Sequence, residues 1–166
     1  MADKLTSFIC RISKYISRMI AVENNEQDSA LVSAFFKVSG NLERIGDHAV
    51  NICEYTKMLE AKAIGFSQYA QAEIRQMKDV SLSAMKLIGN LDHIDMARLE
   101  EISAIEQQID DMTDNFRKNQ MDRMQNGTCS DEACVLYSEL LTDFERIGDH
   151  VLNIGEAMAP IQTSRT

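Results

Sequence analysis

The stretch that decides the fold is NLERIGDHAVNICEY, residues 41–55, and it returns as DFERIGDHVLNIGEA at residues 143–157. Nine of the fifteen paired positions are identical, and the offset of 102 residues suits a repeating unit of three helices. In both copies the apolar residues fall three and four positions apart, which places them on one face of a helix. Gly46 and Gly148 recur inside these helices, where glycine costs about 1 kcal/mol relative to alanine, so they predict close helix approach.

The two expected units are not equally complete. Two expected helices precede the second copy of the motif within its unit, whereas only one precedes the first. The sequence therefore predicts a partial first unit of two helices at residues 1–64 and a complete second unit of three helices at residues 65–166. Because the first unit lacks its opening helix, the chain looks like a truncated tandem of two units. We expect it to be an excised fragment.

Composition extends the helical prediction to the whole chain. Its 166 residues include one proline and seven glycines, too few breakers for the turns of an all-β protein. Ser67, Asp95 and Ser130 are expected N-caps, and Pro160 should end the last helix. The five expected helices lie at about residues 2–22, 26–63, 67–90, 95–126 and 130–160. Because the second would be roughly 57 Å long at 1.5 Å per residue, we predict an all-α fold, an elongated antiparallel helical bundle.

The charge of the chain limits its partners. A net charge of −9, from 17 basic and 26 acidic residues, argues against nucleic acid and favours cations or basic protein surfaces. Apolar stretches are far shorter than the roughly 20 residues that span a bilayer, and the first residues, Met1-Ala2-Asp3-Lys4, lack the apolar segment expected of a signal peptide. We expect a cytoplasmic location, or the cytoplasmic face of the inner membrane for a full-length protein.

A stripe of oxygen-bearing side chains runs beside the apolar seam of each copy. Glu145, Asp149, Asn153 and Glu156 recur four, four and three positions apart, and the first copy repeats this series from Glu43. Like charges four residues apart repel each other by a few tenths of a kcal/mol on an exposed helix. Two readings stay open: neighbouring arginines compensate a solvated flank, or a bound cation does so.

A facing helix carries a matching pair of acids. Glu106 and Asp110 follow core positions of the fourth expected helix, and we expect them to meet the second copy across a groove. The corresponding helix of the first unit offers only Asp3 at a matching level. Carboxylates suit iron, manganese, magnesium and calcium alike, so spacing leaves the metal open. The candidate metal ligands are Glu43, Asp47, Glu106, Asp110, Glu145 and Asp149.

We expect no catalytic activity. The chain has no glycine-rich phosphate loop, no G-x-S-x-G elbow and no Cys/His cluster of the zinc type. A di-iron oxidase of the ferritin-like class needs Glu-x-x-His pairs, and none of the three histidines has glutamate three residues before it. We interpret His48 and His150 as surface or interhelix hydrogen-bonding residues. The cysteines, which show no C-x-x-C spacing, are expected to fill the core; they are Cys10, Cys53, Cys129 and Cys134.

The duplicated Glu-Arg-Ile-Gly-Asp-His with Asn-Ile after it resembles the PhoU family of phosphate-uptake regulators. Asp3-Lys4-Leu5 and the Gly127-x-Cys129 segment are similar to the cytoplasmic PhoU-like domain of bacterial sodium/phosphate cotransporters. The resemblance implies two three-helix units whose Glu/Asp-x-x-x-Asp motifs bind metal clusters, with iron as the expected metal. On this chain those motifs fall on Glu43 with Asp47, Glu106 with Asp110, and Glu145 with Asp149.

Two functions follow from the resemblance. The first is a non-catalytic, metal-binding regulatory domain of phosphate uptake that contacts a phosphate transporter or its regulatory proteins, and reaches a membrane only through such a partner or a missing segment. The alternative is a metal-free helical interaction or dimerisation scaffold of the same fold. Because the missing helix should expose apolar faces, we expect a homodimer.

Overall fold

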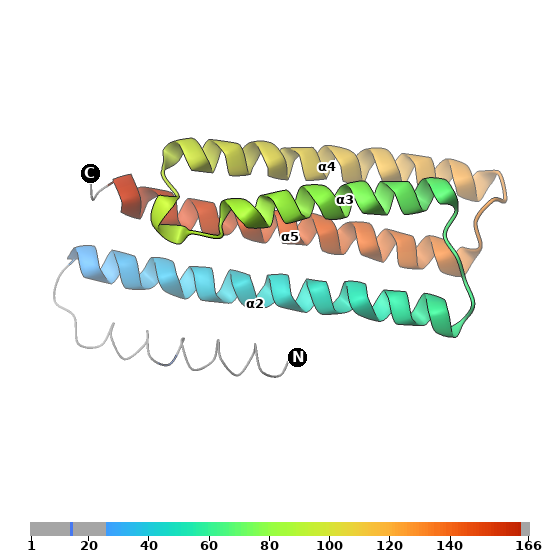
Figure 1. The fold of residues 1–166 in the computed structure, drawn as a ribbon, viewed down its shortest axis with the longest axis horizontal. Coiled ribbons are helices and arrows are strands. Elements are labelled where there is room, and N and C mark those ends of the chain that lie inside the picture. The colour runs from blue at the N-terminus through green and yellow to red at the C-terminus, as the bar shows by residue number, and fades with distance from the viewer. Residues whose placement is uncertain (1–13, 15–25, 164–166) are drawn as a thin grey trace.

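The computed structural model describes residue 14 and residues 26–163. These residues form four long α-helices and one short 3-10 helix, and the described part of the chain contains no strand. The helices lie lengthwise beside one another in an elongated bundle, as Figure 1 shows. The elements are α2 (Glu26–Ala61), α3 (Gln68–Leu87), η1 (Leu91–His93), α4 (Met96–Gln125) and α5 (Asp131–Thr163). The predicted all-α bundle is confirmed, while the expected helix at residues 2–22 lies outside the described residues.

Three polar residues start the last three long helices, as the sequence predicts. The side chains of Ser67, Asp95 and Ser130 accept a hydrogen bond from the backbone N–H three residues later, at 3.2, 2.8 and 3.3 Å. Each bond satisfies an N–H group that has no partner inside its helix. At the other end of α4, Gly127 adopts a φ of 64°, which glycine reaches without steric cost. These local signals set where the chain turns.

The predicted end of the last helix at Pro160 is wrong. Helix α5 continues to Thr163 with Pro160 inside it. A proline removes one N–H group and so leaves the carbonyl four residues earlier without its helical partner. That carbonyl belongs to Glu156, which is exposed, so water can replace the lost bond. A proline in the last turn of a helix therefore does not stop it here.

Helix α5 is the centre of the bundle. It packs against α2, α3 and α4, and its apolar seam of Ile147, Val151, Ile154 and Met158 is buried, as predicted. Its small residues bring α4 close. A Cβ atom added at Gly148 would lie 3.1 Å from Cδ1 of Ile109, so the predicted close approach at this glycine is confirmed. The approach fixes the distance between the acidic stripes of the two helices.

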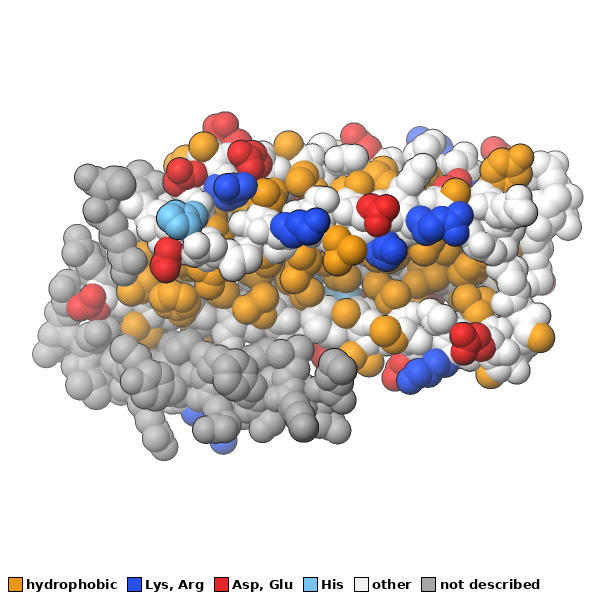
Figure 2. Space-filling view, in the orientation of Figure 1, with side chains coloured by type: hydrophobic (Ala, Val, Ile, Leu, Met, Phe, Trp, Pro, Cys, Tyr) orange, Lys and Arg blue, Asp and Glu red, His pale blue; other side chains and the backbone are white. Residues whose placement is uncertain are grey.

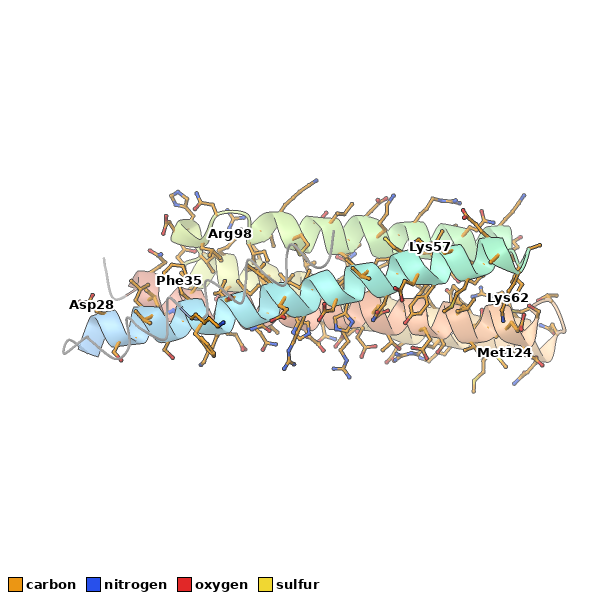
Figure 3. All side chains as sticks on the ribbon, turned by 90° about the horizontal axis from the view of Figure 1, so that it is seen from below. Asp28, Phe35, Lys57, Lys62, Arg98 and Met124 are labelled. Carbon is orange, nitrogen blue, oxygen red and sulfur yellow. The ribbon has the colours of Figure 1, made fainter. Side chains whose placement is uncertain are left out.

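Hydrophobic side chains are not spread evenly over the surface of the bundle. Hydrophobic side chains gather along the channel between α3 and α2 in Figure 2. At one end of the bundle, where Figure 3 labels Lys62 and Met124, the Nζ atom of Lys62 lies 2.9 Å from Oε1 of Glu132 and joins the end of α2 to the start of α5. Among the residues that the structure describes, no helix is long and apolar enough to cross a membrane.

Candidate metal centre

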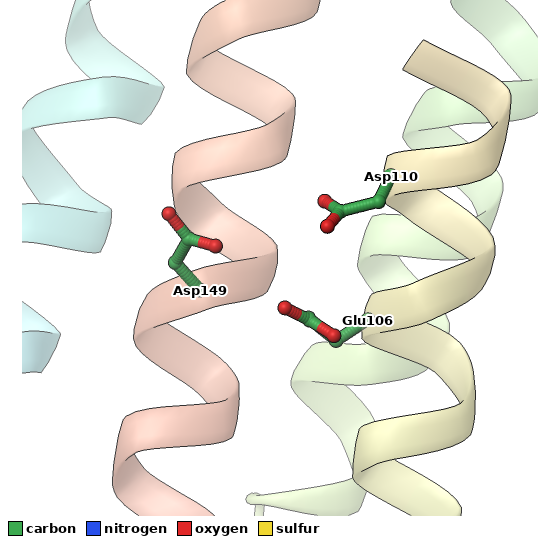
Figure 4. Close-up of side chains that lie close together, drawn as sticks. All are labelled: Glu106, Asp110 and Asp149. Atoms are coloured by element: carbon green, nitrogen blue, oxygen red, sulfur yellow. The ribbon is translucent and has the colours of Figure 1, made fainter. Parts of the chain in front are cut away.

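Three carboxylates meet between α4 and α5. Glu106 and Asp110 stand one turn apart on α4, and Asp149 faces them from α5 (Figure 4). One oxygen atom from each lies within 4.8 Å of the other two, and all three residues are half-buried. Helix spacing explains the arrangement, because positions four apart share a face and the close contact at Gly148 brings the opposite helix within reach.

The electrostatics of this group favour a cation. Burial raises the pKa of Glu106, and the charges of Asp110, Asp149 and Glu156 raise it further. Burial likewise raises the pKa of Asp110, followed by the charges of nearby acids that include Glu145. Both carboxylates are therefore harder to ionise than a free side chain, because burial and the neighbouring negative charges disfavour the ionised form.

One oxygen atom of the group has no partner. Oδ1 of Asp110 is buried and makes no hydrogen bond within the described part of the chain. An unpaired buried oxygen of this kind costs about 1–3 kcal/mol, more when it is charged. A hard cation that prefers oxygen ligands would satisfy it, so the residues present fit a divalent metal ion or iron.

Glu145, the fourth ligand predicted between these helices, is not part of the group. Its Oε2 atom accepts a hydrogen bond of 2.9 Å from Arg117, so an arginine of α4 holds it. Asp149 is within the group, although its Oδ2 atom accepts a bond of 2.9 Å from Arg146. The structure thus brings together three of the four carboxylates expected here. Arg117 lies seven residues after Asp110, on the same helix face, and this spacing is the signal that would have revealed it.

The first copy of the motif has different surroundings. On α2, Glu43 is half-buried and Asp47 is exposed, and neither belongs to a described group of three ligands. The acid expected opposite them, Asp3, lies outside the described residues. Metal binding by Glu43 and Asp47 stays a prediction.

The histidines of the two copies join α2 to α5. Nδ1 of His48 donates to Oδ1 of Asp143 at 2.6 Å, and Nδ1 of His150 donates to Oδ1 of Asn41 at 2.9 Å. The imidazole rings stack with their centroids 5.5 Å apart. Each histidine therefore bonds the first residue of the opposite copy, and the prediction of interhelix hydrogen bonding is confirmed. We call these four residues the histidine clasp.

The clasp is partly buried and includes one charged member. Asp143 is 5% exposed, and it also accepts a bond of 3.4 Å from Nδ2 of Asn51. Burial raises the pKa of Tyr55 to about 12, and a hydrogen bond with Asp143 contributes to the shift. Burial lowers the pKa of His150, and the charges of His48 and Arg44 lower it further.

Sequence reasoning missed a second polar cluster, which lies at the end of the bundle where α3 and α5 begin and α4 ends. Glu73 of α3 pairs with Arg123 of α4 through Oε2 and Nη2 at 2.8 Å, and it also accepts hydrogen bonds from Tyr137 and Asn119. Burial opposes its ionisation, but these bonds outweigh it and hold its pKa below the ordinary value. A charged residue on a face that is otherwise apolar, at the helical spacing of Ala70 and Met77, was the available signal.

In its described residues the protein is an all-helical bundle with a duplicated acidic motif. One copy of the motif faces a second acidic helix. The PhoU domain model matches residues 2–56 and 74–158, which include both copies of the motif. The chain belongs to the PhoU domain family.

Two curated relatives carry this family name. The chain is 29% identical over 141 residues to the phosphate-specific transport system accessory protein PhoU homolog 1 of Thermotoga maritima, covering 81% of the chain and 57% of that protein. It is 22% identical over 130 residues to the PhoU homolog of Deinococcus radiodurans, covering 78% of the chain and 60% of that protein. The chain spans less than two thirds of the length of either relative.

A solved structure shares the fold. The crystal structure of the phosphate transport system regulatory protein PhoU from Streptococcus pneumoniae superposes with a TM-score of 0.85 at 20% identity. The match covers 98% of this chain and 76% of that one. The arrangement of helices is therefore that of a PhoU helical bundle.

Proposed function

We propose that this chain is a non-catalytic regulatory domain of phosphate uptake that acts by contact with a phosphate transport system. The match of the PhoU domain model over both copies of the motif carries this proposal. Two relatives are named as accessory proteins of phosphate-specific transport systems, and these names indicate the process. A transporter or one of its regulatory proteins is the expected partner, and the sodium/phosphate cotransporters remain one such class.

We further propose that the domain binds metal ions between α4 and α5. Glu106, Asp110 and Asp149 would hold the ion, because each supplies an oxygen ligand and Asp110 has a buried oxygen without a hydrogen-bond partner among the described residues. A cation bound there would neutralise the repulsion that, after burial, raises the pKa values of the two acids on α4. Iron is the proposed metal, with manganese, magnesium and calcium as alternatives that accept the same ligands.

A metal-free scaffold of the same fold is the second candidate. The observation in its favour is that two of the motif carboxylates already have cationic partners, Glu145 with Arg117 and Asp149 with Arg146. In this alternative the arginines compensate the acidic stripe, and the domain works by contact alone.

The proposed assembly is a homodimer. Figure 2 shows apolar side chains along the channel between α3 and α2, and helices α2 and α3 also expose the large apolar residues Phe36, Leu42, Met58 and Leu82. Apolar patches of this kind mark contact surfaces in proteins. Light scattering should give twice the mass of the chain, and a monomer at every concentration would contradict the dimer.

Elemental analysis separates the two candidates. The protein is purified without a metal-affinity tag, beside the variant Glu106→Gln/Asp149→Asn, and both are analysed by plasma mass spectrometry after anaerobic incubation with ferrous iron. Stoichiometric metal that the variant loses supports the metal-binding regulator. Absence of metal from both proteins supports the scaffold.

Phosphate uptake by cells tests the regulatory role independently of the metal. Cells without the gene are complemented with the wild type or with the same variant, and uptake of labelled phosphate is measured. An altered uptake that the wild type restores supports the regulatory role, and an effect of the variant ties this role to the carboxylates. Uptake that does not depend on the gene at all would overturn it.

A further inference from the structure

Two cysteines meet where α4 turns into α5. Cys129 comes just before the N-cap residue Ser130, and Cys134 lies in the first turns of α5. These are the two positions whose side chains pack together across a helix start in the hydrophobic staple. The backbone N–H of Cys134 donates to the carbonyl of Ser130 at 2.9 Å, and the thiol of Cys129 lies close enough to raise the pKa of Cys134. The turn therefore holds the two side chains next to each other.

The two thiols differ in access. Cys129 is half-buried, whereas Cys134 is only 5% exposed. Burial raises the pKa of the Cys134 thiol to about 11, and its hydrogen bond with Cys129 contributes. A reagent in solution therefore reaches the sulfur of Cys129 first. Cys53, which is exposed on α2, provides an isolated thiol for comparison.

The sulfur of Cys129 is also the outer end of a buried polar network. Nε2 of Gln120 donates to this sulfur at 3.3 Å, and Oε1 of Gln120 accepts a bond of 3.0 Å from Nε of Arg123. Arg123 in turn pairs with Glu73 of α3. A change at the sulfur thus alters the surroundings of a buried amide that touches the ion pair between α3 and α4.

We propose that Cys129 and Cys134 form a dithiol–disulfide site that responds to small disulfides of the glutathione type. The thiolate of Cys129 attacks one sulfur of the small disulfide, forms a mixed disulfide and releases one small thiolate. The thiol of Cys134 then gives up its proton, attacks the Cys129 sulfur and releases the second small thiolate. Two protein thiols are oxidised, one small disulfide is reduced to two thiols, and the two protons end on the released thiols.

The test uses the full chain with Cys10→Ser and Cys53→Ser, so that only the pair remains. The protein is equilibrated with mixtures of reduced and oxidised glutathione, quenched in acid, alkylated and analysed by intact mass and peptide mapping. We expect the loss of two hydrogen atoms from the peptide that contains both cysteines. We also expect an equilibrium constant at least about tenfold higher in the folded chain than in urea, because the fold holds the thiols together.

Single variants test the order of events. Cys134→Ser should stop at a mixed disulfide on Cys129, whereas Cys129→Ser should leave Cys134 unmodified until the chain unfolds. Equal constants in the folded and unfolded chain, or mixed disulfides alone in the protein that retains the pair, would overturn the proposal. If the serine variants fail to fold, peptide mapping of the wild-type chain gives the same decisive readout, with Cys53 as the internal control.

Discussion

The two copies of the motif have nearly the same sequence but different surroundings. The copy on α5 faces Glu106 and Asp110, and its Asp149 joins them in a group of three carboxylates. On α2, the equivalent Asp47 is exposed and belongs to no such group within the part of the chain that the structure describes. Both copies place their histidines alike, in one clasp. The comparison teaches that the motif specifies how α2 and α5 meet, whereas the facing helix decides whether its acids form a site.

The largest expected effect is on metal affinity, which should depend on Asp149 but not on Asp47. Asp149→Asn removes one carboxylate of the three-carboxylate group, and on the proposed function we expect manganese affinity to fall by more than about tenfold, since losses at metal sites commonly reach that size. Asp47→Asn, the matched change on α2, should keep the affinity within about twofold of wild type. Isothermal titration calorimetry checks both, and equal losses in the two variants would show that the copies bind metal together.

The second largest effect is expected on stability, when either hydrogen bond of the histidine clasp is removed. Asp143→Ala leaves His48 without its acceptor and should lower the free energy of unfolding by about 1–3 kcal/mol, because the lost bond is buried and involves a charged group. Asn41→Ala removes the equivalent neutral bond to His150 and should cost about 1 kcal/mol. Urea denaturation measures both values. A larger loss at Asn41 would mean that the charge of Asp143 does not strengthen its half of the clasp.

Glycine-to-alanine changes on α5 and on α2 test the close approach between α4 and α5. Gly148→Ala places a Cβ atom 3.1 Å from Cδ1 of Ile109 and should cost about 1–3 kcal/mol of stability, because the fully buried Ile109 side chain must shift to make room. In the control, Gly40→Ala on α2, the added Cβ meets nothing within 4 Å, and it should add up to about 1 kcal/mol through helix propensity. Thermal unfolding distinguishes the two, and a neutral Gly148→Ala would show that the Ile109 side chain shifts freely.

The smallest effect is the pH dependence of the metal-free protein. Because the pKa values of Glu106 and Asp110 are raised in the fold, the folded state binds more protons than the unfolded state between the ordinary and the raised values. The contribution of these two acids to stability should therefore fall as the pH rises through this window and stay constant above it. Glu106→Gln should stabilise the metal-free protein above this window and flatten the dependence.

Urea denaturation at a series of pH values in the presence of a chelator measures this effect. Glu43→Gln is the matched control on α2, since that carboxylate lies outside the three-carboxylate group. A steeper pH dependence in Glu106→Gln than in wild type would contradict the prediction.

Much of the fold was predictable because local signals repeat and agree. The caps at Ser67, Asp95 and Ser130 and the apolar seam of α5 each follow from short-range spacing. Pro160 misled because the cost of a proline depends on where its helix ends, which neighbours along the chain do not specify.

The candidate site was only partly predictable, since its contacts join distant segments. Spacing places Glu106, Asp110 and Arg117 on one face of α4, but it could not reveal that Glu145, on another helix, pairs with this arginine. Nor could it reveal that Glu73 becomes buried only because Arg123 and Tyr137 reach it from two other helices. The prediction that the cysteines fill the core is confirmed for Cys134, which is buried, and wrong for Cys53, which is exposed.

The histidine clasp has a consequence for how such a chain could arise. Helices α2 and α5 run in opposite directions (Figure 1). His48 bonds Asp143, the first residue of the second copy, and His150 bonds Asn41, the first residue of the first copy. Contacts of this reciprocal form are those of an isologous interface between identical subunits. Two separate chains with one motif each would make the same pair of bonds by self-association. Joining them in one polypeptide makes the pairing independent of protein concentration, and it frees each half to change alone, as Asn41 and Asp143 already have.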